Sequence, residues 1–248
     1  MLLFSPEDRE RVRRTLLARA EADSRVVGAA VVGSEAEGEL DRFSDIDLTF
    51  AVRFDVPVEE VLHDWTDAMR SEMGGLDLFD IRVDSTIYRV FLLEENLQVD
   101  LSFSPESDFG ATGPRFRLLF GTAVDKPWTG QPDPRELIGL AVHHALRARF
   151  AVERGRLWQA EFWLCETRHH ALALACLGQG LGAWHARAVD GLSPDLLQRF
   201  DETLVGHAEP EDLLRALEAA VELLGEAAKM AGVLSGPMEK RLGGVIST

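Results

Sequence analysis

Two aspartates separated by one apolar residue are the first feature of this chain that suggests chemistry. Asp45 and Asp47 flank Ile46 in the run DIDLTFAVRF, whose composition is typical of a strand. Alternate side chains of a strand point to the same face, so the two carboxylates project together, about 7 Å apart at a rise of ~3.3 Å per residue. Two like charges at this spacing favour a cation between them, and Mg²⁺ prefers such oxygen ligands.

A third acid lies in the later strand-like run NLQVDLSFS, where Asp100 stands between Val99 and Leu101. If this strand neighbours the first one in the sheet, three carboxylates meet on one face. The alternative is that all three are ordinary solvent-facing residues of half-exposed strands. Aspartate is depleted from strands, however, which argues against chance. We therefore predict that Asp45, Asp47 and Asp100 are catalytic residues and metal ligands.

Gly33 and Ser34 follow the apolar run VVGAAVV, and ten residues separate Ser34 from Asp45. A glycine at the end of a strand lets the backbone approach a bulky ligand, and the amides of a turn can donate to phosphate oxygens. Ser34 adds a hydroxyl, and Ser44 stands directly before the acidic pair. We predict that Gly33, Ser34 and Ser44 contact the phosphates of a bound ligand, which the resemblance described next implies to be a nucleotide.

The series V-G-S, ten residues, D-I-D-L and a later V-D-L resembles the pattern of the nucleotidyltransferase superfamily, which has the DNA polymerase beta-like fold. Within it, the chain is most similar to the antibiotic adenylyltransferases of the aminoglycoside type, such as those that modify kanamycin and streptomycin. In these enzymes a small catalytic domain with a mixed sheet precedes a helical bundle.

The resemblance implies Mg²⁺-dependent transfer of AMP from ATP to a hydroxyl of a small molecule, with release of pyrophosphate. An aminoglycoside-like antibiotic is one candidate acceptor, and antibiotic resistance is then the context. Gly33 and Ser34 would hold the phosphates, Asp45 and Asp47 would ligate Mg²⁺, and Asp100 would complete the metal site or help to deprotonate the acceptor. The alternatives are a protein or RNA acceptor, or a nucleotide-binding module without turnover.

The elements that position these residues change in character along the chain. Ser5 and Pro6 are typical of the start of a helix, which we predict over residues 6–23. Four β-rich runs and one more helix, over residues 58–75, follow it. After the Pro- and Gly-rich stretch 126–134 the β signal vanishes. Four amphipathic helical segments remain, over residues 135–155, 156–180, 193–207 and 210–232. We predict an α+β protein: a small mixed-sheet nucleotidyltransferase domain flanked by helices over residues 1–128, followed by an all-α helical bundle domain over residues 129–248.

Some features of the helical half also suggest chemistry. The pairs His143-His144 and His169-His170 are adjacent on predicted helices, where neighbours point about 100° apart, so neither pair alone can chelate a metal, and core packing or surface placement is the preferred interpretation. In the resembled enzymes the helical domain can lend an acidic residue as the acceptor's base. Glu161 and Glu166 are candidates here, although surface or interhelix charges are the preferred interpretation.

The composition bears on partners and compartment. The chain has 42 acidic and 26 basic residues, a formal charge of -16. This charge disfavours a nucleic-acid partner and suits a cationic acceptor, although acidity is also a common solubility device. Cys165 and Cys176 lie about 16 Å apart along one predicted helix, too far to pair, which fits a reducing compartment. Without a signal peptide or a membrane-spanning apolar run, we expect a cytoplasmic protein with no membrane partner, and a homodimer is left open.

Overall fold

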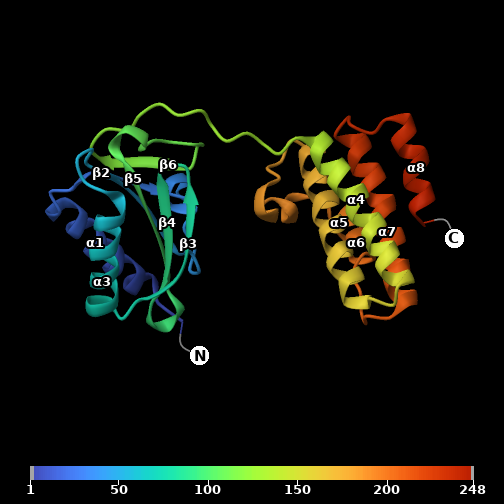
Figure 1. Cartoon of the computed structure of the whole chain (residues 1–248), viewed down its shortest axis with the longest axis horizontal. Helices are drawn as coiled ribbons and strands as arrows, with labels where there is room; N and C mark the ends of the chain where they lie inside the picture. Colours follow the sequence, from blue (N-terminus) through green and yellow to red (C-terminus); the bar gives the residue numbers. More distant parts are fainter. Residues whose placement is uncertain (1–2, 247–248) are drawn as a thin grey trace. The chain divides into compact units, whose positions relative to one another are not determined.

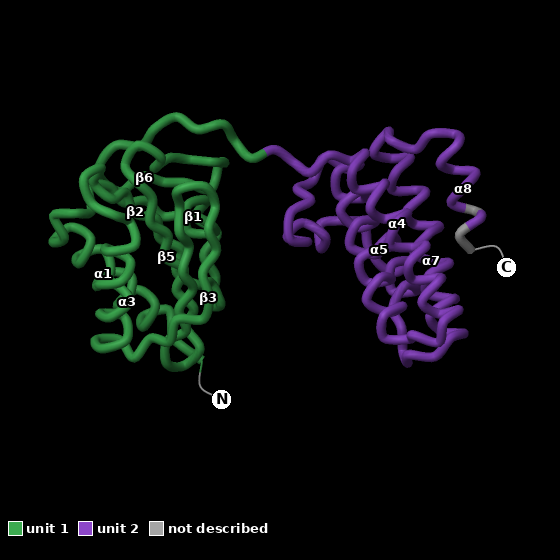
Figure 2. The backbone as a smooth tube through the Cα atoms, in the orientation of Figure 1, with its two compact units in different colours: residues 1–129 green, residues 130–248 purple. Residues whose placement is uncertain are grey.

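The computed structural model describes residues 3–246. The chain divides into two compact units, Met1–Thr129 and Gly130–Thr248, which are coloured green and purple in Figure 2. The first unit is α+β and the second is helical, so the predicted fold class is confirmed. No helix among the described residues is both long enough and apolar enough to cross a membrane.

Unit 1 is built on one six-stranded mixed sheet with the strand order β3-β4-β5-β2-β1-β6 (Figure 1). Its strands are β1 (Val26–Val32), β2 (Ile46–Val52), β3 (Leu76–Val83), β4 (Thr86–Leu92), β5 (Gln98–Pro105) and β6 (Phe116–Phe120). All neighbouring strands are antiparallel except β2 and β5, which run parallel at the centre of the sheet. This parallel pair brings the two predicted acidic strands side by side.

Two long helices, α1 (Pro6–Ala22) and α3 (Val58–Met73), cover one face of this sheet (Figure 1). The helix α1 begins as predicted, because the Ser5 hydroxyl accepts a hydrogen bond from the Asp8 amide and Pro6 takes the first helical position. The shared core contains Phe50 of β2, Trp65 of α3 and Phe103 of β5, whose ring centroids lie 4.8–5.2 Å apart. Burial of one such phenylalanine stabilises the fold by about 1.5–3 kcal/mol, so this core holds β2 and β5 in register.

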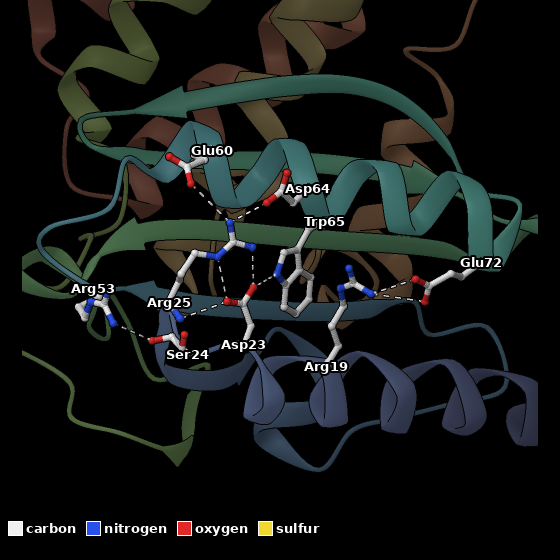
Figure 3. A network of polar contacts seen from close by, with 9 residues as sticks. All are labelled: Arg19, Asp23, Ser24, Arg25, Arg53, Glu60, Asp64, Trp65 and Glu72. Atoms are coloured by element: carbon white, nitrogen blue, oxygen red, sulfur yellow. Dashed lines mark hydrogen bonds and ion pairs between the residues drawn. The ribbon is translucent and has the colours of Figure 1, made fainter.

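A polar network also ties α1 and β1 to α3 (Figure 3). Asp23 at the end of α1 accepts hydrogen bonds from the Arg25 guanidinium at 2.9 Å and from the Trp65 indole at 3.0 Å. Arg25 also donates to Asp64 of α3 at 2.6 Å. These hydrogen bonds, with that from Arg25 the largest cause, lower the pKa of Asp23 to about 2. The network fixes the place where β1 enters the sheet.

Unit 2 contains five α-helices among its described residues. They are α4 (Pro134–Glu153), α5 (Leu157–Gly178), α6 (Pro194–Asp201), α7 (Pro210–Met230) and α8 (Gly236–Ile246). Alanines make up much of the core between α4, α5 and α7, among them Ala141, Ala145, Ala171 and Ala220, which are fully buried. Small side chains at these positions let the helix backbones pack closely.

Three elements were not predicted from the sequence: β6, the short helix α2 (Ser34–Glu37) and α8. The predicted helix over residues 193–207 is shorter than expected, since α6 ends at Asp201. Short 3-10 turns lie at Glu94–Asn96, Glu106–Asp108, Trp184–Ala186 and Val189–Gly191.

Candidate active site

The three predicted carboxylates lie together on the central parallel strands. Asp47 of β2 is directly opposite Asp100 of β5, and Asp45 immediately precedes β2. One carboxylate oxygen from each of the three lies within 4.8 Å of the others, and all three residues are half-buried. The alternating residues Ile46 and Leu48 are 1% exposed, because they point into the core on the opposite face.

A hydrogen-bond donor that was not predicted from the sequence contacts two members of this cluster. Gln98 of β5 donates from Nε2 to Asp100 Oδ1 at 3.0 Å and to Asp45 Oδ2 at 3.5 Å. The signal that could have revealed Gln98 is its position two residues before Asp100, on the same face of the strand. A neutral amide contributes no positive charge of its own to the cluster.

The pKa of Asp100 reflects the unfavourable electrostatic environment of this carboxyl group in the cluster. The pKa of the Asp100 carboxyl is raised to about 6, chiefly by burial and to a smaller extent by the neighbouring charge of Asp45, while the hydrogen bond from Gln98 opposes both. Protonation or a bound cation would each relieve this repulsion. A group of this kind, on a sheet face beside other carboxylates, is typical of functional sites.

Gly33 lies against Asp47, as the predicted site requires. Its backbone has φ +68° and ψ -147°, a conformation that only glycine adopts readily. A Cβ at this position would lie 2.3 Å from Asp47 Oδ2, well inside any real contact distance. The chain therefore needs a glycine here for two independent reasons. Ser34 follows at the first position of α2 and is half-buried.

Ser44 is placed differently from the other predicted residues. Its hydroxyl accepts a hydrogen bond from the Asp41 amide at 2.9 Å and donates to Asp41 Oδ1 at 3.0 Å. Its carbonyl accepts from Arg9 of α1 at 3.0 Å. The side chain of Ser44 therefore shapes the 41–44 turn that leads into β2, and its contact with a nucleotide stays a prediction.

Arginines from distant parts of the sequence hold the segment between Gly33 and Asp45. Arg13 of α1 and Arg117 of β6 both pair with Glu35 of α2, at 2.7 Å and 3.1 Å. Arg115 pairs with Glu37 at 2.6 Å. No local pattern reveals these arginines, because the fold alone brings them to α2. These ion pairs tie α2 to α1, to β6 and to the residue before β6.

Glu161 and Glu166, the candidate bases, lie in unit 2 on α5. Glu166 groups there with His144 of α4 and His170 of α5. Considering each histidine pair separately missed this arrangement, in which one member of each pair meets a member of the other. The segment GQGLGA, residues 178–183, has the glycine spacing of a dinucleotide-binding loop, which requires a strand before it. It begins at Gly178, the last residue of α5, so this spacing marks the end of a helix and not such a loop.

Comparison with known proteins gives little further information. No family model matches the chain, and no curated protein matches it. Among solved structures it is similar to an aminoglycoside 6-adenyltransferase from Bacillus subtilis, with 15% sequence identity and a TM-score of 0.43, over 99% of this chain and 100% of that one. The likeness to a nucleotidyltransferase is thus distant and spans the full length. Values this low say nothing about the activity of the present chain, which is inferred below from its own residues.

Proposed function

We propose that unit 1 catalyses the Mg²⁺-dependent transfer of AMP from ATP to a hydroxyl group of a small acceptor, with release of pyrophosphate. The observation that supports this most is the convergence of Asp45, Asp47 and Asp100 within 4.8 Å, with Gly33 in contact with Asp47. Phosphoryl transfer asks a protein mainly for positioning and charge neutralisation, and little for covalent chemistry.

The residues present fit a magnesium ion. All three candidate ligands are carboxylates, the hard oxygen donors that Mg²⁺ prefers, and a cation would offset both the burial of the Asp100 carboxylate and its repulsion by Asp45. Asp45, Asp47 and Asp100 would hold it. When bound, the ion would neutralise phosphate charge and orient the triphosphate.

The chain's own groups would then align the reactants. The backbone at Gly33 is free of any side chain, so its turn can approach the phosphates closely, and Ser34 can add a hydroxyl donor. The acceptor oxygen would form a bond to the α-phosphorus while the bond from this phosphorus to the bridging oxygen breaks, and pyrophosphate would leave with the electron pair. The acceptor's proton would pass to a carboxylate oxygen of Asp100 or to water.

The proposed class of acceptor is inferred from the net charge of the protein. With a formal charge of -16, the protein would attract a polyamine acceptor such as an aminoglycoside and repel a polynucleotide. A protein acceptor, and binding of a nucleotide without turnover, are the alternatives that the experiment must separate.

The test uses the purified full chain with ATP, Mg²⁺ and a panel of aminoglycosides and other small alcohols, with pyrophosphate release as the readout. We expect D47N to lower kcat by roughly 10²–10³, because it removes a metal ligand that acts on the transition state. D84N is the matched control: Asp84 lies in the β3–β4 turn at φ 51°, where asparagine is readily accommodated.

Normal turnover by D47N would overturn the metal assignment. Pyrophosphate release only in the presence of added cell proteins would identify a macromolecular acceptor. Calorimetric binding of Mg-ATP with no product from any acceptor would identify a module without turnover.

A further inference from the structure

Unit 2 contains a cluster of metal-binding side chains that the proposed function does not use. His144 projects from α4, and Glu166 and His170 project from α5, four residues apart and therefore on one helix face. One ligand atom from each of the three lies within 4.8 Å of the others. The two imidazole rings stack with centroids 5.2 Å apart and an interplanar angle of 20°.

Two ring nitrogens in this cluster are shielded from solvent and have no hydrogen-bond partner: His144 Nδ1 and His170 Nε2. The indole of Trp163, 5.0 Å from the His144 ring, contributes to this shielding. A buried polar atom without a partner costs about 1–3 kcal/mol, and such atoms in a well-packed fold need an explanation. A metal ion bound to both nitrogens would supply one.

Other charged and titratable groups surround the cluster without competing for these nitrogens. Arg147 donates to His143 Nε2 at 2.8 Å and lies over the Trp163 ring. His169 Nδ1 lies 3.7 Å from a Glu166 oxygen, and Cys165 Sγ lies 3.8 Å from His169 Nε2. His169 therefore lies near the Glu166 carboxylate without a hydrogen bond to it.

From this geometry we propose that His144, Glu166 and His170 form a binding site for Zn²⁺ or a similar first-row transition ion. Two imidazoles and one carboxylate suit these ions far better than Mg²⁺, which prefers oxygen alone. Bonds of about 2.0–2.2 Å in tetrahedral geometry require ligand atoms about 3.4 Å apart, so the side chains need only small rotations. Three protein ligands leave a fourth position for water or a bound molecule.

A pocket lies beside one member of the cluster, His170. This pocket of unit 2 is lined by His169 and His170 of α5 and by Trp184 and His185 of the following 3-10 turn. Burial lowers the pKa of both His144 and His170, while Glu166 opposes this shift.

The experiment titrates the full-length protein with Zn²⁺ by calorimetry, in excess Mg²⁺ and in a D45N/D47N background, so that the carboxylates of unit 1 do not contribute. We expect one Zn²⁺ per chain and at least about 100-fold weaker binding for H144Q and for H170Q. H143Q is the matched control, because His143 is the neighbour of His144 on the same helix and faces Arg147. The affinity of H143Q for Zn²⁺ should differ from that of the protein with His143 by less than about threefold.

A second measurement keeps the proposal testable if the variants fail to fold. In the nitrogen NMR spectrum of the wild-type chain, Zn²⁺ should shift the ring signals of two of the seven histidines strongly. Substitution by Co²⁺ should give the visible absorption of imidazole ligation. The proposal is overturned if no histidine signal shifts, if H143Q weakens binding as much as H144Q, or if the H144Q/H170Q double variant binds Zn²⁺ like the wild type.

Discussion

The candidate active site depends on contacts between a few individual residues. Asp47 and Asp100 face each other across the β2–β5 pair, and Gly33 and Gln98 contact them from either side. Each of these contacts leads to a change in stability or activity that can be measured in a single variant.

Replacement of Gly33 by alanine should destabilise unit 1 more than the same change at Gly38. Both glycines have positive φ, but a Cβ at position 38 meets no atom within 4 Å, whereas one at position 33 meets the Asp47 carboxylate. We expect G38A to cost about 1 kcal/mol and G33A about 3 kcal/mol or more. Thermal unfolding measures both. In a D47A background the cost of G33A should fall, and an unchanged cost would contradict the contact.

The raised pKa of Asp100 predicts a pH-dependent gain in stability for D100N. The folded pKa of about 6 lies above the ordinary value of 3.8, so ionisation destabilises the fold as the pH rises through 6. Without metal, D100N should be more stable than the wild type by roughly 1–3 kcal/mol at pH 8 and equally stable at pH 4. Denaturant unfolding in a chelating buffer checks this. Equal stability at pH 8 would show that Asp100 is not destabilised by its neighbours.

The same variant should respond less to magnesium. If the three carboxylates bind the ion, added Mg²⁺ raises the melting temperature of the wild type by mass action. D100N lacks one ligand, so its melting temperature should rise less. D84N should respond like the wild type, because Asp84 lies in the β3–β4 turn.

The polar network of Asp23 and Arg25 acts on whole elements, because it joins α1, β1 and α3 (Figure 3). The pKa of Asp23 is lowered to about 2, so its contribution to stability is present above pH 3.8 and is lost as the pH falls through 2. We expect D23N to destabilise the fold by about 2 kcal/mol at pH 7. D64N, which removes a half-exposed partner of Arg25, should cost under about 1 kcal/mol.

Denaturant unfolding at pH 7 and pH 3 distinguishes the stability cost of D23N from that of D64N. The cost of D23N should shrink at pH 3, where the carboxyl is protonated in the unfolded chain but still ionised in the folded one. A cost equal to that of D64N at pH 7 would contradict a special role for Asp23.

Elements with a strong local pattern could be predicted from the sequence, and the remainder depended on contacts between distant segments. The Ser5-Pro6 start of α1 is a local signal, and it marks where this helix begins. The lone aspartates in apolar strands are also local signals, and they led to the prediction that the three carboxylates share one face of the sheet. The strand β6 is only five residues long and partly exposed, so it has no clear alternation. The helix α8 contains Gly243 and Gly244 and was missed for that reason.

The residues of the candidate sites also fall into those with a local sequence signal and those that depend on contacts between distant segments. The three carboxylates could be found because each one departs from the composition of its own strand. The arginines that hold α2 and the grouping of His144 with Glu166 and His170 could not, because they depend on how β6 and α1 meet α2 and on the register between α4 and α5.

At the scale of the whole molecule, one segment of chain connects the two compact units. This segment lies between Phe120 and Pro134 and contains no helix or strand. The segment before Trp128 contacts unit 1, where Lys126 pairs with Asp108, and Gly130 accepts a hydrogen bond from Trp184 in unit 2. Trp128 itself is 66% exposed. We predict that brief chymotrypsin treatment cleaves beside Trp128 and releases two folded fragments.

That each unit is an independent domain stays a prediction, which the fragments would test. Each fragment should unfold cooperatively. The N-terminal fragment should keep the stabilisation by Mg²⁺, and the C-terminal fragment should keep the binding of Zn²⁺. A fragment that unfolds on release would show that the corresponding unit depends on the rest of the chain.

The contact between Gly33 and Asp47 has a consequence for how this sequence can evolve. Loss of the Asp47 carboxylate would remove the clash at position 33 but not the positive φ, so a lineage that gives up the acid lowers only one of the two barriers to losing the glycine. A lineage that keeps the acid faces both barriers. In descendants of this chain, a non-glycine residue at position 33 is therefore expected mainly together with a residue other than aspartate at position 47.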